Sequence, residues 1–114
     1  MIDAIQEAQS ASLVQIIDTS IWNPNSPDPA GVDYNPSSDS LWITDSEVEE
    51  MPPYFQGVNV FQSTRNGILL STFSTTSYTN EPTGIAIDDQ NQRMFITDDN
   101  QDRVYEINRG SDGL

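Results

Sequence analysis

The chain of 114 residues contains no cysteine, no histidine and no lysine. These absences exclude Ser-His-Asp and Cys-His nucleophiles, histidine-ligated zinc, Schiff-base chemistry and the lysine of phosphate-binding loops. Any remaining chemistry must use carboxylates, hydroxyls, amides, arginine or a metal held by oxygen atoms. Calcium is the metal that such a ligand set suits best. Without cysteine, disulfides cannot indicate the cellular compartment.

Basic residues are scarce as well. Four arginines stand against 18 acidic residues, and the net charge is -14. This field repels phosphate groups, so we expect no nucleic acid partner and no attachment to anionic lipids. It attracts cations, although a heavily solvated acidic surface is the simpler interpretation.

The first twelve residues, MIDAIQEAQSAS, have neither the basic segment nor the apolar core of a signal peptide. No run of the sequence approaches membrane-spanning length, so we expect no membrane insertion. Either the chain stays inside the cell, or its targeting signal lies outside this segment.

One stretch of the sequence occurs twice. GVDYNPSSDSLWITDS begins at Gly31, and GIAIDDQNQRMFITDD begins 53 positions later at Gly84. The two copies align without a gap, and the identical pairs are Pro29/Pro82, Gly31/Gly84, Ile43/Ile96, Thr44/Thr97 and Asp45/Asp98. The repetition predicts two copies of one structural unit.

Alternating segments rich in β-branched residues, separated by turn formers, predict strands, and long helical periodicity is absent. The Asn66-Gly67 pair is a strong hairpin signal. The expected strands are Leu13–Thr19, Gly31–Tyr34, Leu41–Thr44, Val58–Thr64, Ile68–Ser74, Gly84–Ile87, Met94–Thr97 and Arg103–Asn108. The fold class is therefore all-β, after a polar lead-in over residues 1–12.

Four short strands in 40–50 residues are typical of one β-propeller blade, a sheet that must pack on neighbouring blades. With blade strands lettered A to D from the centre outward, the chain reads D, then A-B-C-D, then A-B-C. We therefore predict two four-stranded antiparallel blades over residues 13–114, with repeats starting near residues 29 and 82. The closing strand is displaced to the front.

The pattern Pro-x-Gly-hydrophobic, a turn, then aromatic-Ile-Thr-Asp resembles blades of NHL-type and gluconolactonase/phytase-like propellers. The two repeats look most like propeller segments of large secreted cyanobacterial-type proteins that bear haemolysin-type calcium repeats, which the terminal GSDGL also resembles. The resemblance covers about Leu13 to Leu114. It implies a ring of about six blades, and an extracellular or periplasmic location within a larger protein.

The resemblance also implies a metal site. Asp28 and Glu81 occupy the same repeat position, just before Pro-x-Gly, where gluconolactonase-like propellers place a glutamate ligand of the central calcium. Innermost strands converge, so one acid from each blade can contribute to an oxygen cage. The chain departs from that family in offering two acids and no nearby histidine, and both side chains also fit solvated loop acids.

A second set of candidate calcium ligands follows the second repeat. In DDNQD, Asp98, Asn100 and Asp102 fall at every second position, like the opening of a calcium loop. Arg103 stands where that loop needs glycine. The alternative is that Asp45 and Asp98 cap the turns after their strands.

The acidic loop SEVEEM could bind a cation or a basic partner through Glu47, Glu49 and Glu50, or simply be exposed. Most aromatic side chains lie on expected strands, where core packing between blades is the natural role. Trp22 lies in a proline-rich loop and receives no assignment.

These observations favour a non-catalytic β-propeller binding or scaffold module, with calcium as a stabilising cofactor. The alternative is a fragment of a calcium-dependent lactonase or phosphoesterase-type hydrolase, in which Asp28 or Glu81 acts as base or nucleophile. Two blades alone expose the faces meant for neighbours. We therefore expect either self-association, in a ring of about three copies, or completion by the remaining blades of a larger chain.

Overall fold

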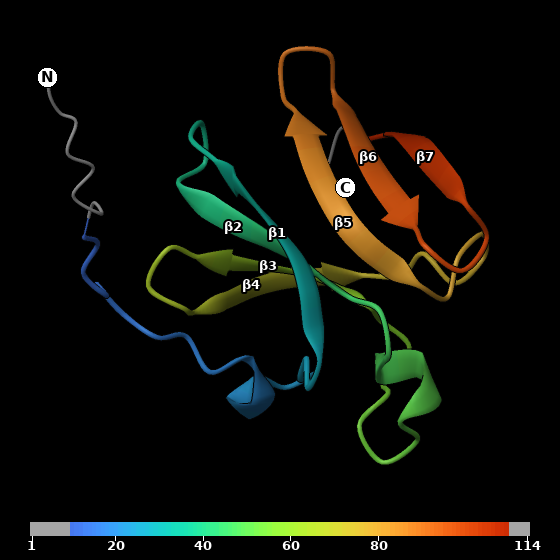
Figure 1. The fold of residues 1–114 in the computed structure, drawn as a ribbon, viewed down its shortest axis with the longest axis horizontal. Helices are drawn as coiled ribbons and strands as arrows, with labels where there is room; N and C mark the ends of the chain where they lie inside the picture. The colour runs from blue at the N-terminus through green and yellow to red at the C-terminus, as the bar shows by residue number, and fades with distance from the viewer. Residues whose placement is uncertain (1–9, 110–114) are drawn as a thin grey trace, which may run out of the picture.

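The structure consists of two antiparallel sheets that lie side by side (Figure 1). It is a computed structural model that describes residues 10–109. The first sheet holds β1 (Pro29–Asn35), β2 (Ser40–Asp45), β3 (Val60–Thr64) and β4 (Leu69–Phe73) in sequence order. The second holds β5 (Pro82–Asp88), β6 (Arg93–Asp98) and β7 (Arg103–Asn108). Neither sheet is closed, and the predicted all-β class is confirmed.

Short 3₁₀ turns are the only helical elements in the described part of the chain. They are η1 (Thr19–Ile21), before the first sheet, and η2 (Val48–Glu50), between β2 and β3. No helix within residues 10–109 has the length and apolar character needed to cross a membrane.

The predicted strand over Leu13–Thr19 is wrong. The chain has no regular structure from residue 10 to residue 18, and η1 begins at Thr19. Leu13, Val14 and Ile16 are exposed by 77%, 91% and 80%. A strand needs a neighbour for its backbone hydrogen bonds, and no strand of the described chain pairs with this segment.

The lead-in predicted over residues 1–12 is described only at residues 10–12, which are irregular. Its first nine residues, and the terminal segment GSDGL, lie outside the described residues.

The sequence repeat is also a repeat of strand register. Gly31 pairs with Thr44 and Gly84 with Thr97, and each first strand carries one irregularity just after its proline. A proline at the first position of a strand costs no ladder hydrogen bond. The two copies therefore build the same hairpin twice.

The two sheets pack with unlike faces together. The face of the first sheet that carries Trp42 and Val60 (the Trp42 face) meets the face of the second sheet that carries Met94 and Ile96 (the Ile96 face). In the repeat the counterpart of Ile96 is Ile43, which points away from the second sheet. The packing is thus head-to-tail: one face of the first repeat unit packs on the face of the second unit that corresponds to its own opposite face.

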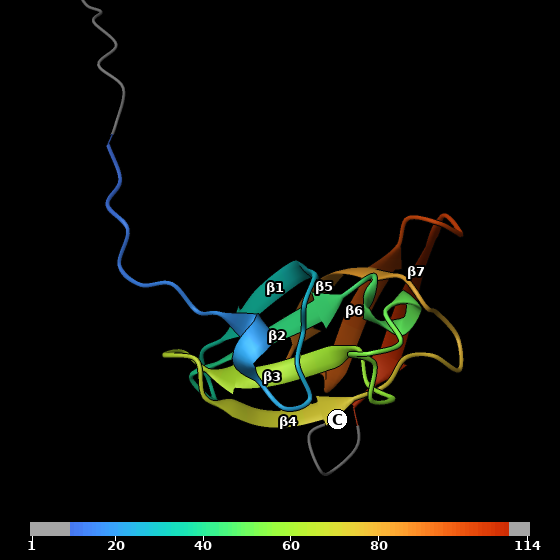
Figure 2. The same ribbon diagram turned by 90° about the horizontal axis from the view of Figure 1, so that it is seen from below.

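The opposite side of the first sheet, which carries Ile43 and Phe61 (the Ile43 face), is covered at these two residues by the chain that precedes β1, while Val32 and Tyr34 on the same face stay exposed. Trp22 and Ile17 pack on it, and η1 lies against this side (Figure 2). The Trp22 ring centroid is 6.0 Å from that of Phe61, and its Nε1 donates to the carbonyl of Gly67 at 2.9 Å. Trp22, unassigned from sequence, is a core residue.

Strands β1 and β5 lie next to each other at the junction of the sheets (Figure 1). Thr44 Oγ1 donates to the carbonyl of Thr83 at 3.2 Å, and the Ile87 amide donates to Asp33 Oδ2 at 2.7 Å. Gly31 of β1 lies against Gly84 of β5, and Asp33, further along β1, contacts Ile87, further along β5, so the two strands run in the same direction.

Candidate functional site

The end of β2 is fixed by a buried aspartate that has no exposed surface, Asp45. Its Oδ2 accepts from Ser26 Oγ at 2.7 Å and from the Asp28 amide at 2.9 Å. Its Oδ1 accepts from the amides of Glu47 at 3.0 Å and Val48 at 2.8 Å. The carboxylate therefore ties the segment before β1 to the turn after β2.

Asp98 performs the same task at the end of β6. It accepts from Thr79 Oγ1, and from the amides of Asn100 at 2.9 Å and Gln101 at 2.8 Å. The Thr79 hydroxyl is the first cause of the lowered pKa of Asp98, because it stabilises the charged form. Thr79 Oγ1 in turn accepts from the Glu81 amide at 3.0 Å.

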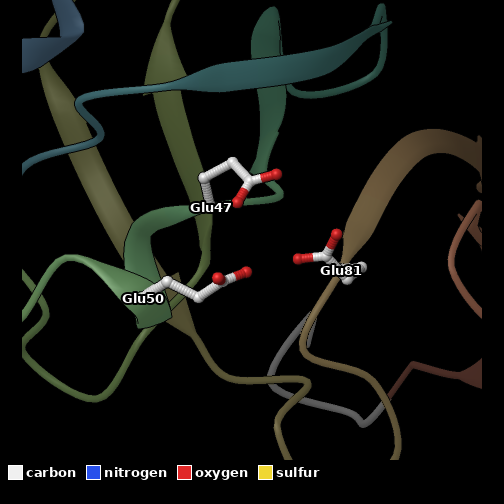
Figure 3. A group of neighbouring side chains, drawn as sticks. All are labelled: Glu47, Glu50 and Glu81. Carbon is white, nitrogen blue, oxygen red and sulfur yellow. The ribbon is translucent and has the colours of Figure 1, made fainter.

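We call Asp45 and Asp98 the clamp aspartates. The segments that they hold carry glutamates to the junction of the sheets, where three of them meet (Figure 3). Glu47 lies two residues after Asp45, which accepts from its amide; Glu50 is the last residue of η2, and Glu81 directly precedes β5. One carboxylate oxygen of each lies within 4.8 Å of the others. We call Glu47, Glu50 and Glu81 the glutamate triad.

The triad is electrostatically unfavourable when all three groups are charged. Burial, followed by the charges of Glu47 and Glu50, raises the pKa of Glu81 to about 7. Burial and the Glu50 charge also raise the pKa of Glu47. Glu81 Oε2 is buried and accepts no hydrogen bond from residues 10–109. A proton or a divalent cation would relieve this repulsion.

The sequence-predicted ligands separate in the structure. Glu81 belongs to the triad. Asp28 is exposed and outside it, although its charge contributes to the raised pKa of Glu47. Asp98 caps its turn, while Asn100 and Asp102 are exposed on the β6–β7 turn. Their role as calcium ligands stays a prediction.

Sequence reasoning named all three triad residues but never brought them together. The sequence places Glu47 and Glu50 in one acidic loop with Glu49, which lies outside the triad. The repeat contained a usable signal, because Glu47 lies two residues after Asp45 at the end of β2 and Glu81 directly precedes β5. The sequence does not show that β1 and β5 are adjacent, and this adjacency is what brings Glu47 and Glu81 together.

Comparison with protein-family models, with curated proteins and with solved structures found no match. The resemblance to NHL and gluconolactonase-like blades therefore stays a prediction.

Proposed function

We propose that the chain is a non-catalytic β-propeller scaffold module whose blade junction is stabilised by calcium at the glutamate triad. The head-to-tail packing of the two repeats carries this proposal. In a propeller each blade places one face on the opposite face of the next, and the innermost strands gather around the axis. The Trp42 face on the Ile96 face, with β1 beside β5, fits that arrangement.

A sandwich of two sheets is the competing arrangement. In a sandwich, the inner faces of two sheets interdigitate to form a common core, and each sheet keeps an outer face for solvent. Here the Ile43 face of the first sheet has a second apolar cluster of its own, built from Trp22, Ile43 and Phe61. A sheet with apolar clusters on both faces is typical of a unit that has neighbours on both sides.

The case for calcium rests on oxygen chemistry at the junction. Calcium takes carboxylate oxygens with flexible geometry, and the triad supplies oxygens from both sheets. Glu47 and Glu50 come from the first sheet's β2–β3 connection and Glu81 from the entry to the second sheet (Figure 3). A cation there would bridge the two units, and would satisfy the buried Glu81 Oε2.

Thermal unfolding at pH 7.5 with and without calcium tests the proposal. At a calcium concentration ten times the dissociation constant, we expect about 1.4 kcal/mol of added stability, and a melting temperature higher by about 6–10 °C. Glu81→Gln and Glu50→Gln should each abolish most of this shift. Glu49→Gln is the matched control, because Glu49 neighbours the triad without belonging to it.

An equal calcium response in Glu81→Gln and in the unsubstituted chain would contradict the triad as the site. Asp102→Asn separates the other candidate set, because calcium bound on the β6–β7 turn would lose its effect in that variant alone.

The hydrolase alternative makes a separate prediction. Turnover of a simple lactone or phosphoester that requires calcium and is lost in Glu81→Gln, with folding intact, would replace the scaffold proposal by the catalytic one.

A further inference from the structure

Thr19, just before the first sheet, and Thr75, between β4 and β5, make the same pair of hydrogen bonds. Thr19 Oγ1 donates to the carbonyl of Ser26 at 2.6 Å, and the Ser26 amide returns a bond to the Thr19 carbonyl at 3.0 Å. Thr75 Oγ1 donates to the carbonyl of Thr79 at 3.0 Å, and the Thr79 amide returns one at 2.8 Å. Ser26 and Thr79 are themselves counterparts, since each donates to its clamp aspartate.

Thr19 is therefore the structural counterpart of Thr75. Thr75 lies two residues after the end of β4, so residues 13–17 are the counterpart of β4. The packing agrees, because Ile17 packs on the Ile43 face of the first sheet just as Phe73 packs on the Ile96 face of the second. The segment over residues 13–17 (the N-terminal segment) thus occupies the place of an outermost strand.

The N-terminal segment differs from β4 in one respect. Strand β4 is hydrogen-bonded to β3, whereas residues 13–17 have no neighbouring strand in the described chain. Three of their side chains are exposed and apolar: Leu13, Val14 and Ile16. The N-terminal segment, which is irregular in this structure, therefore lies in the position of an outermost strand without a sheet to pair with among the described residues.

In the described part of the chain, the second sheet lacks the outermost strand that the first sheet has in β4. Within residues 10–109 it contains three strands, and the only strand beside β7 is β6. Its Val104 is exposed by 66%. Unpaired strand edges readily accept another strand, and the edge of β7 corresponds to the edge of β3 that β4 covers in the first sheet.

We propose that the N-terminal segment of a second copy of this chain adds to β7 as the fourth strand. The same association places the free face of the second sheet, which carries Phe95, on the part of the second copy's Ile43 face that stays exposed, where Val32 and Tyr34 of β1 are exposed by 62% and 42%. This interface repeats between copies the head-to-tail packing already present within one chain, and head-to-tail contacts close into rings when their rotation permits. The inference rests on the propeller arrangement proposed above.

The internal repeat also gives the register. Trp42 pairs with Gln62 and its counterpart Phe95 pairs with Glu106, so Glu106 corresponds to Gln62. Gln62 pairs with Ser71 across β3 and β4, and Ser71 lies four residues before Thr75 as Gln15 lies four before Thr19. Glu106 of one copy should therefore lie opposite Gln15 of the next.

A second copy fits better than an unrelated partner because both halves of the interface are already present on one chain. The Trp42 face and the Ile96 face show that such faces are complementary. The N-terminal segment is already held beside the first sheet through Ile17 and through Gln15 Nε2, which donates to the carbonyl of Arg65 at 2.7 Å.

Light scattering of the full chain tests the association. We expect a mass that is a multiple of 12.7 kDa, and a reduction of at least twofold for Gln15→Pro combined with Ile16→Pro, because proline removes the ladder donors of the segment. Ser10→Pro combined with Ala11→Pro is the matched control and should keep the full mass. A monomeric unsubstituted chain, or an undiminished mass for the Gln15/Ile16 variant, would overturn the proposal.

Disulfide trapping tests the register, since the chain has no cysteine of its own. Gln15→Cys and Glu106→Cys variants, mixed and oxidised, should form a mixed disulfide at least fivefold faster than Ile21→Cys mixed with Glu106→Cys. Equal rates would overturn the proposed pairing. Calcium-dependent melting of the Gln15/Ile16 proline variant then tests the glutamate triad independently, so the two proposals can fail separately.

Discussion

Gly31 in β1 lies directly against Gly84 in β5, with no room for a side chain between the two strands. A Cβ on Gly31 would come within 2.8 Å of the Gly84 Cα and 2.5 Å of the Thr83 carbonyl oxygen. Both neighbours are backbone atoms and cannot rotate away. The junction of the two sheets therefore depends on the glycine that the repeat places at the same position in each copy.

We expect Gly31→Ala to destabilise the protein by about 1–3 kcal/mol, because overpacking against backbone forces the two strands apart. Gly84→Ala is the comparison, since its Cβ would meet only the Thr97 hydroxyl oxygen, at 2.8 Å, and that side chain can change rotamer. Urea unfolding of both variants measures the difference. Equal destabilisation by the two substitutions would contradict the contact described here.

Replacing either clamp aspartate by asparagine, which has nearly the same shape, should destabilise the fold. Asn in place of Asp45 turns one acceptor into a donor that faces two existing donors, at a cost of about 2–4 kcal/mol. Asp98→Asn should also destabilise, and its effect should depend on pH. The lowered pKa of Asp98 means that its carboxylate stabilises the fold above the ordinary value near 3.8, and that this contribution disappears as the pH falls through the folded-state pKa.

Chemical denaturation of Asp98→Asn and the unsubstituted chain between pH 2.5 and pH 6 measures this dependence. The stability gap between them should be constant at the upper end and narrow toward the lower end. A gap that stays constant over the whole range would contradict the assigned role.

The glutamate triad predicts the opposite pH dependence. With the pKa of Glu81 raised from 4.5 to about 7, the folded chain holds a proton that the unfolded chain has released. Stability should therefore fall as the pH rises from 4.5 to 7. Glu81→Gln should remove most of this slope in thermal unfolding, and saturating calcium should do the same for the unsubstituted chain. An unchanged slope in Glu81→Gln would show that another group carries it.

The two hairpins could be predicted from the sequence because their information is local. Alternation, turn residues and the repeated Pro-x-Gly and Ile-Thr-Asp motifs fix strand and register within about fifteen residues. The error at Leu13–Thr19 has a different origin. Its side-chain pattern is that of a strand, and it matches β4 in position, but strand structure also requires a partner that the described chain does not pair with it.

The candidate site was beyond sequence reasoning for a related reason. Glu47 and Glu81 are brought together by the close approach of β1 and β5, and no local pattern reports that approach. The capping role of Asp98, by contrast, was predictable, because an aspartate after a strand commonly accepts from the amides two and three residues later. Contacts within one turn were therefore predictable, while contacts between the two sheets were not.

Arg109 provides a last test of how the sheets are joined. Its guanidinium lies 5.5 Å from the centre of the Trp42 ring and pairs with Asp89 at 2.5 Å, and its side chain is only 7% exposed. Arg109→Ala should cost about 1–3 kcal/mol, through lost stacking and a partly desolvated ion pair.

Arg65→Ala is the control, because the Arg65–Asp39 pair is 3.4 Å long with side chains that are 66% and 60% exposed. Exposed pairs of this kind contribute about 0–1 kcal/mol. Arg109→Lys keeps the charge but loses the planar group that lies over Trp42, so it should fall between the two. Urea unfolding followed by tryptophan fluorescence measures all three variants, and a loss in Arg109→Ala no larger than in Arg65→Ala would show that this contact does not hold the sheets together.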